Sequence, residues 1–140
     1  MPSPMIFFRP ILTLLLLAPF FVLSQTDFRS LRFGMSPSQV KGLTLEIEDG
    51  PTSLYIMNQE LMLENEILSD AMLTFTGGKL SAIRTNCSVK NNDTLIRLLE
   101  KQFGKLRRSD PRKNHWQNSQ VKVTLDRLKN NDVVIIIDKA

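Results

Sequence analysis

The sequence predicts an α+β fold, a two-layer sandwich in which helices lie on one face of an antiparallel sheet. Three observations favour it. A capped helix start near Ser36 precedes a set of short β-type segments, and a second capped helix precedes another set. Most of these segments alternate apolar and polar residues, which is typical of strands with one buried face. We therefore predict two tandem units of one helix and about three strands, 37–88 and 93–138.

The first 24 residues differ from the rest in composition. One basic residue precedes an apolar run, 11–23, which is shorter than the roughly 20 residues of a membrane span. Val22 and Ser24 suit the −3 and −1 positions of a signal-peptidase site. We predict that residues 1–24 are a signal peptide cleaved before Gln25, so that the protein is periplasmic or secreted. An uncleaved membrane anchor is the alternative.

The predicted mature chain, 25–140, is long enough for one domain and is unevenly charged. Residues 25–88 carry 5 basic and 8 acidic side chains, whereas residues 89–140 carry 12 basic and 6 acidic ones. The second part can present a basic face to an anionic partner, although two halves can also differ in charge without a function. Cys87 is the only cysteine, and a small buried apolar role is favoured over a reactive or bridging thiol.

The stretch Phe33-Gly34-Met35-Ser36-Pro37-Ser38-Gln39-Val40 has the features of a helix start. Ser36 is a good N-cap, the proline suits the first helical position, and the glutamine completes a capping box. Met35 and Val40 occupy the positions of a hydrophobic staple. Gly42 predicts that this helix is short.

Four strand segments are predicted after this helix. The segment 44–48 ends at the turn cluster 49–51, and the segment 53–63 is predicted as one strand, with a helix over 60–64 as the alternative for its last part. The segments 71–76 and 79–83 flank Gly77-Gly78, which predicts a hairpin with a two-residue turn.

The turn fixes the register of this hairpin. It gives three cross-strand pairs: Phe75 with Leu80, Leu73 with Ala82, and Thr74 with Ser81. One face of the hairpin is then apolar and the other polar. This alternation puts Cys87 on the more polar face unless a bulge intervenes.

The second unit begins with a helix over 94–103, capped by Asn91-Asn92-Asp93 and ended by Gly104. Its apolar stripe consists of Leu95, Ile96, Leu99 and Phe103. A polar loop follows, and the strands predicted after it are 115–117, 121–128 and 133–137. The last strand is apolar at both parities, which predicts a central strand covered on both faces.

These motifs carry a family resemblance. The Gly-Met-Ser-Pro-Ser-Gln-Val opening resembles that of BamE/SmpA-like small envelope proteins and of a broad set of uncharacterised secreted bacterial proteins. In those proteins a hairpin like 73–80, a helix ending like Phe103-Gly104 and a tryptophan strand like that of Trp116 follow. The resemblance implies a helix-plus-sheet tandem, as in BamE-like and β-lactamase-inhibitor-like domains, and a role in binding other proteins. The chain lacks the lipidated cysteine of BamE, so we expect no lipid anchor.

Few residues of the sequence suggest catalysis or metal binding. His115 is the only histidine, so one chain has no His-based metal cluster, and nothing local supports its pairing with Cys87 as a nucleophile and base. The acidic residues 60–70 lack the spacing of a calcium loop. We predict a non-enzymatic protein without a cofactor or a metal.

One basic loop is the candidate binding site. Its residues are Lys105, Arg107, Arg108, Arg112, Lys113 and His115, with Trp116 after them. Such a loop can bind the phosphates of a lipid or glycan, or an acidic protein. The alternative is an exposed loop without a function and a Trp116 packed into the core.

The prediction for function follows from these features. We expect an exported protein that binds another envelope or secreted protein, or assists its assembly. The alternative is binding of an anionic lipid or glycan through residues 105–116. An exported protein is not expected to bind nucleic acid.

Overall fold

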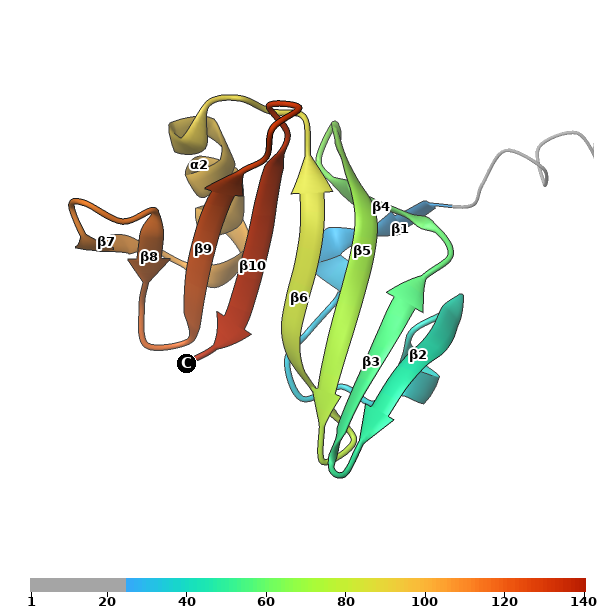
Figure 1. Cartoon of the computed structure of the whole chain (residues 1–140). Coiled ribbons are helices and arrows are strands. Elements are labelled where there is room, and N and C mark those ends of the chain that lie inside the picture. Colours follow the sequence, from blue (N-terminus) through green and yellow to red (C-terminus); the bar gives the residue numbers. More distant parts are fainter. Residues whose placement is uncertain (1–24) are drawn as a thin grey trace, which may run out of the picture.

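The computed structural model describes residues 25–140 (Figure 1). These residues form a single mixed sheet of ten strands and one α-helix, and strands account for 53% of them. The predicted sandwich of two helix-plus-three-strand units is therefore wrong. The predicted signal peptide, 1–24, lies outside the described residues.

The strands are β1 (Gln25–Asp27), β2 (Leu43–Asp49), β3 (Thr52–Met57), β4 (Glu60–Leu63), β5 (Glu66–Thr76), β6 (Lys79–Cys87), β7 (Arg107–Asp110), β8 (His115–Gln117), β9 (Val121–Arg127) and β10 (Val133–Lys139). Most consecutive strands are joined by short connections, but residues 28–42 separate the first two strands and a helix lies between β6 and β7. The order across the sheet is β1-β4-β5-β6-β10-β9-β8-β7, and β3 and β2 form a branch beside β5. All neighbours are antiparallel except β1 and β4.

The branch arises from the length of β5, which has 11 residues. The first part of β5 pairs with β4, and the second part pairs with β3. The single strand predicted over 53–63 is therefore two strands, separated by Asn58-Gln59. The Asn58 N–H donates to the Gly42 carbonyl at 2.7 Å, which holds this bend against the start of β2.

The first predicted helix is only a 3₁₀ turn, η4 (Pro37–Gln39). Its capping signal is real, because the Gln39 Oε1 accepts from the Ser36 N–H at 2.8 Å. No apolar stripe follows, however, and none of the three turn residues is buried. A helix in a protein depends mainly on packing of an apolar face, so these local signals stabilise one turn and no more.

The β5–β6 hairpin has the predicted turn but a different register. Phe75 pairs with Leu80 as predicted, whereas a bulge at Ser81 pairs Leu73 with Ile83. The bulge reverses the parity of β6 beyond that point. As a result Cys87 is buried in the core, with only 1% of its surface exposed.

The helix α2 (Asn92–Phe103) confirms the second helix prediction. Asn91 caps it, accepting from the Asp93 N–H at 2.9 Å, and Gly104 ends it with a φ of 83°. The predicted stripe is buried against the sheet: Leu95, Ile96, Leu99 and Phe103. Another 3₁₀ turn, η3 (Phe28–Ser30), packs on the same face, and the Phe28 ring meets the Phe103 ring edge-on at 6.1 Å.

The strand β10 lies in the middle of the sheet between β6 and β9, as predicted (Figure 1). Its Ile135 and Ile137 face the core under α2, and Val134, on the opposite face, is also buried. The polar loop expected after α2 instead contains β7, which forms an edge of the sheet with β8.

Candidate functional site

The predicted basic loop is a β-hairpin, β7–β8, at one edge of the sheet next to α2 (Figure 1). In its register Arg107 pairs with Gln117 and Arg108 pairs with Trp116. Successive residues of a strand point to opposite faces, so the two arginines lie on opposite faces of the sheet. Trp116 is buried in the core, which places Arg108 on the face covered by α2.

The structure therefore divides the six predicted residues. His115 lies on the face of Arg107, with its Nδ1 3.3 Å from the Thr124 Oγ1. Arg112 and Lys113 occupy the hairpin turn, and Lys105 precedes β7. The six residues do not form one patch, because Arg107 and His115 lie on one face of the sheet and Arg108 lies on the other, while the remaining three lie outside the strands.

Arg108 is held by contacts with neighbouring residues of the hairpin. Its guanidinium carbon lies 5.3 Å from the centroid of the Trp116 ring. The Nε donates to the Lys113 carbonyl at 3.3 Å, and the Nη2 donates to the Asn114 Oδ1 at 3.4 Å. A cation over an aromatic face is stabilised by the ring quadrupole, so this guanidinium is held in place before any partner arrives.

Arg108 lines an open cleft of about 550 Å³, here called the amino-terminal cleft. The cleft is lined by Lys90, Asn91, Asn92, Asp93, Arg108, Trp116 and Arg127. Three cations therefore face one carboxylate at the amino terminus of α2, where the helix dipole also favours an anion. The Arg127 Nη2 donates to the Lys90 carbonyl at 2.7 Å and ties β9 to the helix cap. Sequence reasoning missed Lys90 and Arg127, which come from distant segments and carry no local signal.

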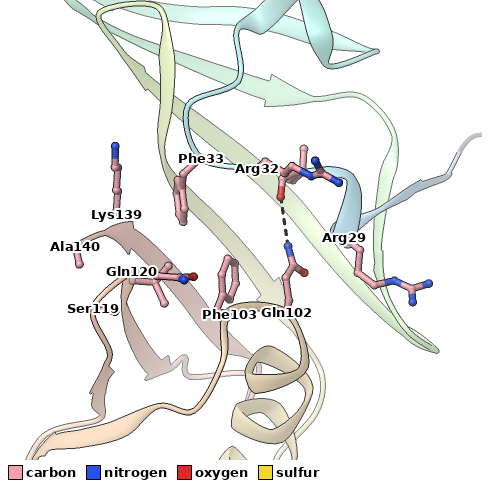
Figure 2. Close-up of a pocket in the computed structure, with 11 residues that line it drawn as sticks. Arg29, Arg32, Phe33, Gln102, Phe103, Ser119, Gln120, Lys139 and Ala140 are labelled. Atoms are coloured by element: carbon pink, nitrogen blue, oxygen red, sulfur yellow. Dashed lines mark hydrogen bonds between the residues drawn. The ribbon is translucent and has the colours of Figure 1, made fainter.

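A second hollow, the carboxy-terminal cavity, lies at the other end of α2 (Figure 2). Its volume is about 690 Å³. It is lined by Arg29, Leu31, Arg32, Phe33, Gln102, Phe103, Ser119, Gln120, Val121, Lys139 and Ala140. The rings of Phe33 and Phe103 stand 6.1 Å apart in a tilted arrangement. The sequence predicted a core position for Phe103 but no cavity.

Gln102 forms one wall of this cavity. Its Nε2 donates to the carbonyls of Phe28 at 3.4 Å and Leu31 at 3.3 Å. These two bonds fix which end of the amide faces the backbone. The Oε1 is buried and accepts no hydrogen bond from the described residues.

The groups with catalytic chemistry lie apart. Cys87 is on the core face of β6, and burial raises the pKa of its thiol. His115 is on the opposite face of β8, with β10 and β9 between the two strands. The described residues contain no group of three or more His, Cys, Asp or Glu arranged to hold a metal. In the same part of the chain, no helix has the length and apolar character needed to cross a membrane.

No protein-family model, curated protein or solved structure matches the chain. The resemblance to BamE-like proteins therefore remains a prediction from short motifs. The tandem fold that it implied is contradicted by the ten-stranded sheet. The surface features that could bind a partner are the amino-terminal cleft, the carboxy-terminal cavity and the edges of the sheet.

Proposed function

We propose that residues 25–140 are a non-enzymatic binding domain of an exported protein, and that the domain binds an acidic segment of a partner protein. The proposed site is the amino-terminal cleft together with the free edge of β7. The observation that carries this proposal is the convergence of Lys90, Arg108 and Arg127 beside an edge strand.

The edge position of β7 favours an extended protein segment as the partner. Within residues 25–140, β7 is the last strand in the sheet order and pairs with β8 alone. Its other side offers backbone N–H and C=O groups to an added strand. Acidic residues on one side of that strand would face Arg108 and the cleft, and those on the other side would face Arg107.

The chemistry of the cleft supports recognition rather than catalysis. Its charged groups are two guanidinium groups, one ammonium group and the Asp93 carboxylate. Guanidinium groups stay charged at neutral pH and form paired hydrogen bonds to carboxylates or phosphates. Arg108 and Arg127 are already held by backbone carbonyls, so binding costs less side-chain entropy.

The binding proposal is tested with a fluorescent hexaglutamate peptide at low salt. The double variant Arg107→Glu/Arg108→Glu should weaken binding at least tenfold. The matched control, Lys41→Glu/Lys79→Glu, reverses two exposed cations in the other half of the chain and should change binding less than twofold. Equal losses in both variants would show a response to net charge alone and would contradict the site.

A second experiment distinguishes binding of a protein segment from binding of an anionic lipid. Vesicles of phosphatidylcholine with phosphatidylglycerol are offered to the same variants in a sedimentation assay. Binding of the vesicles in the absence of peptide binding would overturn the proposal in favour of the anionic lipid alternative. Thermal melting of each variant confirms that the fold is retained.

Export is tested separately by expressing the whole chain with its first 24 residues in a bacterial host. The expected product is a periplasmic protein whose amino-terminal sequence begins at Gln25. A cytoplasmic product that retains residues 1–24 would contradict export. This result does not depend on what the cleft binds.

A further inference from the structure

The carboxy-terminal cavity has an apolar interior. Leu31 and Val121 are fully buried beneath it, and Phe103 is only 9% exposed. Figure 2 shows the rings of Phe33 and Phe103 next to each other, with the Gln120 side chain directed toward Phe103. A cavity of about 690 Å³ with aromatic walls is of the size that holds a small organic molecule.

The walls of the cavity are held by side chains that bridge separate segments. The Gln102 Nε2 ties α2 to the turn η3. On the other side, the Asn118 Nδ2 donates to the Phe103 carbonyl at 2.7 Å. The Asn118 Oδ1 accepts from the N–H groups of Gln120 and Val121 at 2.8 and 2.9 Å. These bonds hold the cavity in shape, so a ligand pays little for ordering it.

The rim of the cavity is cationic. Arg29, Arg32 and Lys139 line it, and no Asp or Glu side chain does. Arg29 is engaged by Asp27 at 3.0 Å. Within residues 25–140, neither the Arg32 guanidinium nor the Lys139 ammonium group has a hydrogen-bond or ion-pair partner. Figure 2 shows these side chains extending outward from the rim rather than into the aromatic interior.

From this division of chemistry we infer that the carboxy-terminal cavity binds a small amphipathic anion of the fatty-acid type. The apolar chain of the ligand lies against the packed rings of Phe33 and Phe103, and its carboxylate lies at the cationic rim. This site is independent of the proposed function, because it uses the opposite end of α2 and none of the residues of the amino-terminal cleft.

The test uses decanoate as the probe, with isothermal titration calorimetry on the chain 25–140. Decanoate should bind with one site per chain, and decanol, which lacks the charge, should bind at least tenfold more weakly. The double variant Arg32→Ala/Lys139→Ala should weaken decanoate binding at least tenfold. The control Lys122→Ala removes a cation from the opposite face of the neighbouring strand β9 and should leave binding unchanged.

A blocking variant tests the interior. Gln120→Trp places a large side chain toward Phe103 and should abolish decanoate binding while hexaglutamate binding at the cleft is kept. Absence of decanoate binding to the unaltered chain would overturn the inference. Binding that survives both the rim variant and the blocking variant would also overturn it, because the ligand would then lie elsewhere.

Discussion

The two ends of α2 present opposite chemistry to solvent. At the amino-terminal end, Lys90, Arg108 and Arg127 surround an open cleft with a polar helix cap. At the carboxy-terminal end, Phe33 and Phe103 line a cavity of about 690 Å³. One helix therefore supports a site that depends on charge and a site that depends on apolar burial.

This difference follows from how each end is covered. The first turn of α2 carries polar residues and a favourable dipole, and the β7–β8 hairpin brings Arg108 to it. The last turn carries Phe103 and is covered by the segment 28–33, which supplies two further aromatic rings. The two sites share α2 as their common support, and each has its own neighbouring segment.

The largest expected effect comes from the shared support. Leu99→Ala removes a fully buried side chain from the middle of α2 and should lower the free energy of unfolding by about 2–5 kcal/mol. Both binding activities should be lost together at temperatures where the variant is unfolded. The comparison variant is Leu98→Ala, at a half-buried position beside the stripe, which should cost much less. Urea unfolding measures both, and similar costs would contradict the packing of α2 described above.

A smaller effect should be confined to one end. Asn91→Ala removes the cap that accepts from the Asp93 N–H, and should cost about 1 kcal/mol of unfolding free energy. It should weaken hexaglutamate binding at the cleft and leave decanoate binding at the cavity unchanged. Asn92→Ala, one residue further on, removes no cap and is the control for the unfolding free energy alone, because Asn92 also lines the cleft. Equal weakening of the two ligands would show that the ends are not separable.

The smallest effect concerns Cys87, which lies near the amino-terminal end of α2. Burial raises the pKa of this thiol, against a smaller opposing contribution from the Val89 N–H. The folded state therefore prefers the neutral thiol. Its contribution to stability is complete below the pKa of the unfolded thiol, about 8.5, and is lost as the pH rises through the higher pKa of the folded state.

The corresponding experiment compares the intact chain with Cys87→Ala in urea from pH 7 to pH 10.5. The difference in unfolding free energy between the two should shrink above about pH 9, because only the intact chain carries the buried thiol. The variant serves as the control for every other pH-dependent contribution, because the two proteins differ only at residue 87. A difference that stays constant with pH would show that the thiol is not held neutral by burial.

The sequence predicted the elements whose signals are local. The cap at Asn91, the stripe ending at Phe103 and the Gly77-Gly78 turn all have the predicted form. The fold class was wrong because the capped turn at Ser36 resembles a helix start, although no apolar stripe follows it. The bulge at Ser81 and the branching of β5 depend on pairing between strands, which no local pattern reports.

The residues of the two sites were also hard to predict, because they come together only through contacts between distant segments. Arg108 was among the predicted residues because it lies in a basic stretch. Lys90 and Arg127 lie 37 residues apart in sequence and meet only when β9 reaches the helix cap. The cavity joins the segment 29–33 to residues at the start of β9 and at the end of β10, so its rim cations are scattered in the sequence.

The most direct test of the two-site account is a pair of NMR titrations on the ¹⁵N-labelled chain 25–140. Hexaglutamate should shift the amides of residues 90–93 and 107–116, and decanoate should shift those of residues 29–33, 102–103 and 119–121. Each ligand should leave the other set in place when added second. Overlapping sets of shifted amides, or no saturable shifts with either ligand, would contradict the assignment of separate functions to the two ends of α2.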